Sequence, residues 1–139
     1  MIYVFELKEK AIGKERPRFN TQTGKAYTPE KTQSFEELIK WTFISKYKLK
    51  EKPSLRPFKV EIRVVYKPSK SVTKQMLLYT KDKPCVVRPD VDNIAKIILD
   101  ALNKIVYQDD SQVCDLHITK KYGEEDRITI VLEELGLVD

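Results

Sequence analysis

The chain contains few of the residues that form the commonest catalytic and structural metal sites. Its single histidine, His117, gives little support to a His–Cys zinc site or to a Ser–His–Asp triad. The two cysteines, Cys85 and Cys114, lie far apart and form no CxxC motif, so we expect two free thiols in a reducing cytoplasm. No apolar run approaches the roughly 20 residues that cross a bilayer, and the N-terminus lacks the pattern of a secretory signal. We therefore expect a cytoplasmic protein with no membrane partner.

The length leaves room for one domain and too little for two. The chain has 139 residues, of which 41% are apolar and 34% are charged, as is typical of a soluble globular protein. It contains no internal repeat and no low-complexity segment. We therefore predict a single domain over residues 1–139.

The charge is distributed unevenly along the chain. Lysine and arginine number 26 against 21 aspartates and glutamates, which gives a net charge of +5. Residues 1–88 hold 21 basic and 9 acidic side chains, a balance of +12, whereas residues 89–139 hold 5 and 12, a balance of −7. Differently charged solvated faces are one explanation. A basic surface for a polyanion, such as nucleic acid, an anionic membrane surface or a phosphorylated ligand, is the other.

Local patterns predict the element order β-α-β-α-β-β. Alternation of apolar and polar residues predicts strands, and apolar residues spaced by three and four predict helices, the first with Thr28 as N-cap and Pro29 at its first position. Residues 8–29 are expected to form a loop or loose hairpin around Gly24. The predicted strands span 2–7, 58–66, about 112–121 and about 126–133, and the predicted helices span about 29–47 and about 91–106. This order favours a single α+β domain in which two helices pack against a mixed, largely antiparallel sheet.

Several apolar side chains outside the strands are also expected to lie in the core. Phe19 and Tyr27 stand beside basic residues and could stack on exposed bases, but core packing is the expectation for both. Cys114 is expected to be buried as well. In the first predicted helix the apolar residues have broadly helical spacing and most of them are expected to lie in the core: Phe35, Leu38, Ile39, Trp41, Phe43 and Ile44.

Acidic residues surround the second predicted helix. Asp90 and Asp92 stand two residues apart where a basic loop, residues 67–90, meets the helix. Capping of the free N–H groups by either aspartate is the structural alternative. Asp92, Lys96 and Asp100 then recur every four residues and form a polar stripe, for which an ion pair on a solvated face is the alternative.

The adjacent acids Asp109 and Asp110 follow directly after this helix. Hard cations such as Mg²⁺ and Mn²⁺ bind carboxylate oxygens. Convergence of Asp90, Asp92 and Asp110 would therefore build a metal site that activates water and polarises a phosphoryl oxygen. The DxD pattern also occurs in sugar-nucleotide transferases and in structural cation sites, but 139 residues leave little room for a nucleotide-binding domain.

The run RPDVDNIAKIILDALNKIVYQDDSQV, residues 88–113, resembles the RusA-type Holliday-junction resolvases, endodeoxyribonucleases often encoded by prophages. The family pattern is PDxDN, a lysine four residues after the second aspartate, then DALN, and then a DD pair before a strand. Basic GKERPR at residues 13–18, YTP at 27–29 and KKY at 120–122 extend the resemblance over nearly the whole chain.

The resemblance implies a Mg²⁺-dependent or Mn²⁺-dependent homodimer that binds four-way junctions and cuts two strands symmetrically, with no small-molecule cofactor. It implies metal ligands Asp90, Asp92 and Asp110 and the catalytic lysine Lys96. The residues expected to support them are Asn93, Asp100 and Asp109.

The basic residues ahead of the acids are candidates for contacts with DNA phosphates, which hold the duplex without reading its sequence. They are Lys14, Arg16, Arg18, Lys70, Lys74 and Arg88, and each taken alone is equally compatible with an ordinary surface charge. Two functions stay open. One is a metal-dependent endonuclease of DNA recombination and repair, and the other is a non-catalytic junction-binding protein that keeps the acids for structure.

Overall fold

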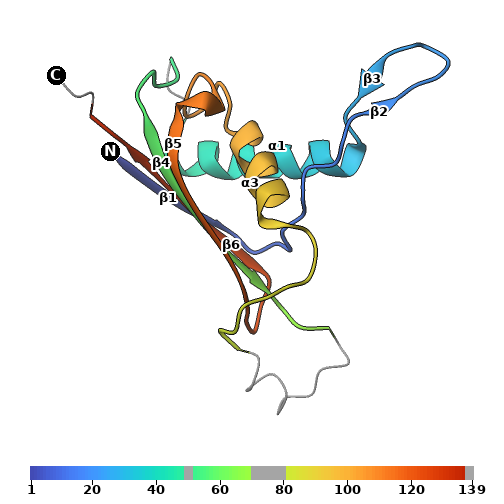
Figure 1. The fold of residues 1–139 in the computed structure, drawn as a ribbon. Coiled ribbons are helices and arrows are strands. Elements are labelled where there is room, and N and C mark those ends of the chain that lie inside the picture. Colours follow the sequence, from blue (N-terminus) through green and yellow to red (C-terminus); the bar gives the residue numbers. More distant parts are fainter. Residues whose placement is uncertain (49–51, 70–80, 137–139) are drawn as a thin grey trace.

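A computed structural model describes residues 1–48, 52–69 and 81–136. One sheet contains β1 (Ile2–Leu7), β4 (Phe58–Tyr66), β5 (Val113–Tyr122) and β6 (Arg127–Glu134), in the order β1-β6-β4-β5. β4 runs parallel to β5, whereas the β1–β6 and β4–β6 pairs are antiparallel. The helices α1 (Glu30–Tyr47) and α3 (Val91–Ala101) lie on the same side of this sheet (Figure 1). The predicted α+β fold is confirmed.

The core lies between the sheet and the two helices. Strand β4 alternates strictly, so that Phe58, Ile62 and Tyr66 face the helices and are buried, while Lys59 and Arg63 face solvent. The apolar stripe of α3 covers this face with Ile94, Ala95, Ile97, Ile98 and Ala101. The polar stripe of α3, Asp92, Lys96 and Asp100, therefore lies on the side of the helix away from the sheet, where a ligand can reach it.

Helix α1 differs from its prediction at its start and on its outer face. It begins at Glu30, with Pro29 as N-cap and no side-chain capping bond, so the proposed Thr28 cap was wrong. Phe35, Ile39 and Phe43 form the buried stripe, with Ile44 partly buried beside it. Leu38 and Trp41 are 39% and 53% exposed because they fall outside that stripe, so the prediction that most of the six apolar residues lie in the core is confirmed with these two as exceptions.

The chain leaves α3 earlier than its apolar pattern predicts. The helix ends at Ala101 rather than near residue 106, and Lys104 adopts a positive φ of 64°. Leu102 and Val106 are nevertheless buried, which explains why a helical pattern continues in the sequence. A short 3₁₀ turn, η1 (Asp110–Gln112), then leads into β5.

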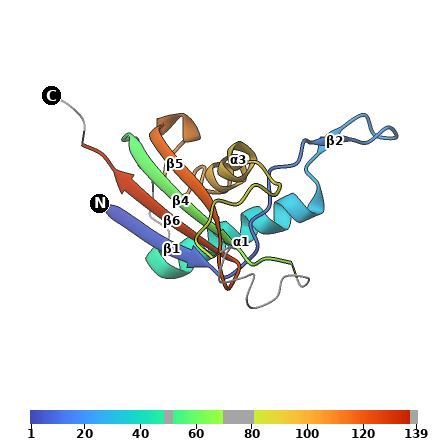
Figure 2. The ribbon, with the colours of Figure 1, turned by 60° about the horizontal axis from the view of Figure 1, so that its bottom comes forward.

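A small hairpin lies within residues 8–29, as expected. Strands β2 (Arg18–Phe19) and β3 (Ala26–Tyr27) pair antiparallel, and Gly24 takes the positive φ of 69° that the turn requires. The hairpin projects away from the body of the molecule in both views (Figures 1 and 2). Phe19 and Tyr27 are 64% and 49% exposed, so their expected core packing was wrong: strands of two residues have no second layer to pack against.

The cysteine predictions are confirmed in part. Cys85 and Cys114 are both free thiols, and Cys85 is buried. Cys114 is exposed because it lies near the start of the edge strand β5, so its predicted burial was wrong. No helix in the described part of the chain has the length and apolar character needed to cross a membrane.

Candidate active site

Two exposed carboxylates mark the N-terminus of α3. Asp90 is the N-cap residue in extended conformation (ψ 152°), and its carbonyl oxygen accepts from the Ile94 N–H at 3.1 Å. Its side chain makes no capping bond. Neither Asp90 nor Asp92 makes a side-chain hydrogen bond or ion pair with any other residue that the structure describes. Capping therefore does not explain these acids, and both are accessible to a ligand.

The backbone around Asp90 is held from two sides. From β5, the Lys120 ammonium donates to the carbonyl oxygens of Val87 at 2.6 Å and Pro89 at 2.9 Å. From the other side, the Lys14 N–H donates to the Asn93 carbonyl oxygen at 3.0 Å. Asn93, one of the expected supporting residues, thus contributes its backbone to the contact. These bonds fix the entry into α3 and with it the position of the Asp90 carboxylate.

Gly13 makes the close approach on this second side possible. A Cβ atom at position 13 would lie 2.9 Å from the Cβ of Pro89 and 3.0 Å from the Cβ of Asn93. Both distances are below ordinary carbon–carbon contact, so a side chain here would push the segment away from the start of α3. The glycine of the GKERPR motif therefore has a packing role at the site.

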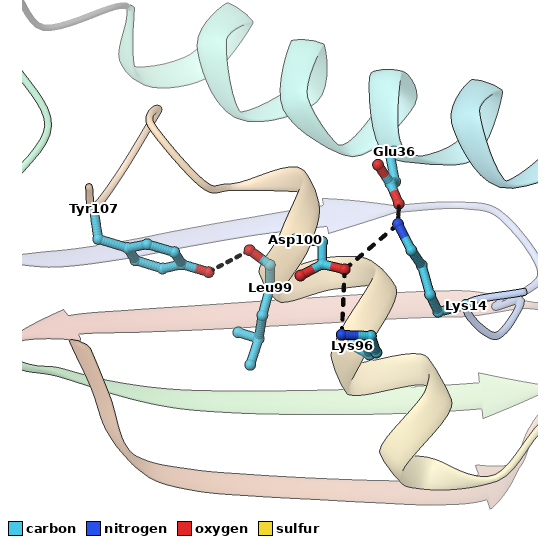
Figure 3. Close-up of polar contacts among 6 residues, drawn as sticks. All are labelled: Lys14, Glu36, Lys96, Leu99, Asp100 and Tyr107. Carbon is cyan, nitrogen blue, oxygen red and sulfur yellow. Dashed lines mark hydrogen bonds and ion pairs between the residues drawn. The ribbon is translucent and has the colours of Figure 1, made fainter. Parts of the chain in front are cut away.

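A chain of opposite charges crosses from α1 to the polar stripe of α3 (Figure 3). The Lys14 ammonium forms ion pairs with Glu36 of α1 and with Asp100 at 3.4 Å. Asp100 also pairs with Lys96, at 3.8 Å. Burial lowers the pKa of Lys14, but the bonds and charges of Glu36 and Asp100 outweigh it and raise the pKa above its ordinary value. The ammonium of Lys14 is thus paired with two carboxylates, and its role at the site is to link α1 to the polar stripe of α3.

The acidic pair after α3 is divided between two roles. Asp109 caps the 3₁₀ turn: its carboxylate accepts from the Ser111 N–H at 3.0 Å, and its own N–H donates to the Gln112 side chain at 2.9 Å. The bonds from Ser111 lower the pKa of Asp109. This reciprocal capping box fixes the turn that carries Asp110. Asp109 therefore supports the site structurally, through its cap.

Asp110 faces the far end of the α3 stripe. Burial raises the pKa of its carboxyl, and so do a hydrogen bond with Asp100 and the charges of Asp100 and Asp109, while Lys96 lowers it. Tyr107, three residues before Asp110, is fully buried, and its hydroxyl donates to the Leu99 carbonyl oxygen at 2.7 Å (Figure 3). The structure thus brings Asp110, Asp100 and Lys96 together, and the excess of negative charge there favours a bound cation.

The donor set fits a hard divalent cation. Asp90, Asp92 and Asp110 offer carboxylate oxygens, which Mg²⁺ and Mn²⁺ prefer. Asp92 and Asp100 lie eight residues apart on one helix face, about 12 Å along its axis, with Lys96 between them. Within residues 1–48, 52–69 and 81–136, no three Asp, Glu, His or Cys side chains are grouped closely enough to hold a metal ion. The shared metal site of Asp90, Asp92 and Asp110 stays a prediction.

A groove of about 490 Å³ opens beside Asp90. Its lining combines Asp90 and Asn93 at the start of α3 with residues 10–15 and the first turn of α1. Three of its basic residues, Lys10, Lys31 and Arg88, come from separate segments of the chain. The groove therefore presents positive charge directly next to an exposed carboxylate, an arrangement suited to a phosphate backbone.

The predicted DNA-binding residues lie in different surroundings. Arg88 lines the groove, whereas Arg16 and Arg18 are exposed at the base of the hairpin. Lys70 and Lys74 fall outside the described residues, so their role stays a prediction.

The sequence reasoning missed four residues that the structure places at the site. Lys10 and Lys31 carried no signal, because only the fold joins their segments into one groove. Glu36 also carried none. Lys120 did carry a signal, because it belongs to the KKY element at 120–122, but that element does not reveal its bonds to the backbone of Val87 and Pro89.

The comparison with known proteins agrees with this geometry. A family model described as endodeoxyribonuclease RusA matches residues 9–133, which include both motif regions and the groove. The chain is also similar to the uncharacterized protein YqaN of Bacillus subtilis (strain 168), with 30% identity over 131 residues that cover 90% of this chain and 91% of the relative. The chain belongs to the RusA family of endodeoxyribonucleases, nucleases that act on branched DNA junctions.

Proposed function

We propose that this chain is a Mg²⁺-dependent endodeoxyribonuclease that resolves Holliday junctions by paired, symmetric hydrolysis of two phosphodiester bonds. The observation that carries the proposal is the exposure of Asp90 and Asp92, without a protein partner in the described part of the chain, and the place of Asp90 in the lining of a groove that is rich in basic residues. Acids beside a phosphate path weaken DNA binding unless a cation lies between the two negative groups. These acids therefore serve a metal-dependent nuclease, in which they bind the cation, whereas in a protein that only binds DNA they would weaken binding.

Asp90, Asp92 and Asp110 would hold the metal, and Mn²⁺ would serve as a substitute. When bound, Mg²⁺ makes a water molecule more acidic and neutralises charge that develops on the phosphate oxygens. The cut leaves a 5′-phosphate and a 3′-hydroxyl end. Asp90 and Asp92 sit at the start of α3 and Asp110 sits on the capped 3₁₀ turn that follows it, so binding of one metal ion by all three would draw these segments closer together.

Lys96 is the chain's own source of positive charge for the reacting phosphate. Its side chain is 61% exposed, and its ion pair with Asp100, at 3.8 Å, is loose enough to be exchanged for a phosphate oxygen. Asp100 is restrained by Lys14 and so limits where the Lys96 ammonium can lie. Lys96 is the proposed catalytic residue, and Asp100 and Lys14 position it.

A homodimer accounts for the paired cuts. One chain holds one set of these carboxylates, whereas resolution of a junction requires cleavage of two opposed strands. Two-fold symmetry presents an identical site to each strand. We therefore propose that the active form is a homodimer.

A synthetic four-way junction tests the proposal. With Mg²⁺ the protein should produce paired nicks at symmetric positions, and with EDTA it should produce none. Asp92→Asn should abolish the nicks while it leaves junction binding in EDTA intact. Asp115→Asn serves as the matched control, because Asp115 is exposed in register with Lys59 on the outer face of the sheet.

The outcomes separate the proposal from its alternative. Tight, salt-sensitive junction binding without cleavage under any divalent ion would establish a non-catalytic binding protein instead. Cleavage by Asp92→Asn at the wild-type rate would refute the assignment of the site.

A further inference from the structure

The β2–β3 hairpin, residues 18–27, exposes two aromatic rings that the rest of the fold does not use. Phe19 is 64% exposed and Tyr27 49%. The hairpin stands clear of the sheet and of both helices (Figures 1 and 2). Large apolar side chains gathered on a projecting element mark an interaction site. The two exposed rings therefore indicate that the hairpin binds another molecule.

The two rings occupy opposite faces of this ribbon. Arg18 pairs with Tyr27, and Phe19 pairs with Ala26. Paired residues share a face and neighbours along a strand do not, so Tyr27 and Arg18 lie on one face and Phe19 on the other. A ribbon with a ring on each side is suited to insertion between two flat partners.

The charge of the hairpin favours a polyanion. Residues 15–27 hold Arg16, Arg18 and Lys25 against the single acid Glu15. Arg18 pairs with Glu15 at 3.6 Å, but both side chains are exposed, so this pair is weak and Arg18 can bind a phosphate instead. An exposed ring beside an exposed guanidinium is the usual composition of a surface for unpaired nucleotides.

The hairpin also adjoins the groove that ends at Asp90. Glu15, three residues before β2, lines the groove, and so does Lys31, in the first turn of the helix that follows β3. A DNA strand whose phosphates lie along Lys31 and Arg88 would therefore carry its next nucleotides toward the hairpin. The segments that carry Glu15 and Lys31 therefore lead directly from the groove beside Asp90 into the two strands of the hairpin.

We propose that the β2–β3 hairpin inserts at the branch point of the DNA, where Tyr27 and Phe19 stack on bases of two different arms and Arg18 holds an adjacent phosphate. The inference rests on the proposed function, since it takes branched DNA as the substrate. Every base has a flat face, so this contact tolerates any sequence. A continuous duplex keeps its bases stacked on one another, so the hairpin distinguishes branched from linear DNA.

The test is equilibrium binding in EDTA of a four-way junction and of a linear duplex of the same sequence. The variant Phe19→Leu/Tyr27→Leu keeps apolar side chains but removes both aromatic rings. It should bind the junction at least tenfold more weakly and bind the duplex within about threefold of wild type. Tyr27→Trp in a wild-type background should retain junction binding. The matched control is Trp41→Ala, which removes an exposed ring from α1.

A second measurement reports position directly. With p-benzoylphenylalanine in place of Phe19, photo-crosslinks should map to nucleotides at the branch point. Crosslinks along the arms, or equal weakening of junction and duplex binding in the double leucine variant, would overturn the proposal. A changed sedimentation coefficient of that variant would also overturn it, by assigning the hairpin to the contact between two copies of the chain.

The two proposals fail in different ways. A wild-type protein that binds junctions but never cuts them would refute the nuclease proposal, while the binding data still decide the role of the hairpin. A wild-type protein that cuts junctions, together with a leucine variant that binds them normally, would refute the hairpin proposal alone.

Discussion

The ammonium of Lys120 on β5 donates to the carbonyl oxygen of Pro89, the residue before Asp90, at 2.9 Å. A second bond to the Val87 carbonyl oxygen, at 2.6 Å, closes a two-point clamp on the loop that delivers the first carboxylate. Lys120 contacts no reacting group in this arrangement. Its charge is used to hold backbone, which makes it a positioning residue for Asp90.

Replacement of this clamp should slow cleavage more than it weakens binding. Lys120→Met removes both bonds, and a carboxylate displaced by about 1 Å can cost roughly a hundredfold in rate. We expect kcat for junction cleavage to fall tenfold to a hundredfold, with junction affinity in EDTA nearly unchanged. Lys120→Arg should restore part of the rate. The control is Lys121→Met, whose exposed side chain lies on the opposite face of β5, and equal loss of affinity in both methionine variants would contradict the clamp.

A methyl group at position 13 should disturb the same loop from its other side. Gly13→Ala places a Cβ within 3.0 Å of both Pro89 and Asn93, so one segment must move. We expect the free energy of unfolding to fall by about 1–3 kcal/mol, measured by urea denaturation, with a parallel loss of cleavage. Gly136→Ala is the control, since no atom of the residues that the structure describes lies within 4 Å of its Cβ position. An unchanged unfolding midpoint for Gly13→Ala would show that the segments around Pro89 and Asn93 accommodate the methyl group without loss of stability.

The sequence predicts those parts of the fold that depend on a periodic pattern of residues within a single strand or helix. Apolar residues occupy every second position of residues 58–66, with Val65 as an additional apolar residue, and the strand has these bounds. Asp92, Lys96 and Asp100 recur every four residues, and they do form one polar stripe apart from the buried residues of α3. In both cases the pattern lies within a single element.

The parts that the sequence does not predict depend on contacts between elements. Trp41 is an example. Its spacing from the other apolar residues of α1 is helical, but the residues that the sheet covers are Phe35, Ile39 and Phe43, and Trp41 is exposed. The contact of Lys14 with Glu36 joins residues 22 positions apart, and that of Lys120 with Pro89 joins residues 31 apart. No local pattern records such distances. Candidate ligands were therefore visible in the sequence, whereas the residues that hold them in place were not.

The Lys14 bridge should give the protein a specific loss of stability at high pH. The pKa of Lys14 is raised above its ordinary value of 10.5, so the bridge contributes fully below that pH and is lost as the pH rises through the folded-state pKa. Lys14→Met leaves Glu36 and Asp100 without their shared cation and should cost about 1–3 kcal/mol at pH 8. The difference in unfolding free energy between wild type and variant should shrink above pH 10.5. A difference that stays constant to pH 12 would show that the bridge does not depend on the charge of Lys14.

The role of Asp109 can be separated into its cap and its charge. Asp109→Ala removes the bond to the Ser111 N–H and should cost about 1 kcal/mol of stability. It also loosens the turn that carries Asp110, so we expect cleavage to fall about tenfold while junction binding in EDTA is retained. Asp109→Asn keeps a capping oxygen but no charge, and should therefore retain most of the wild-type rate and stability. If the alanine and asparagine variants lose cleavage equally, the negative charge of Asp109 acts on the metal or on Asp110 directly, and the capping role is insufficient.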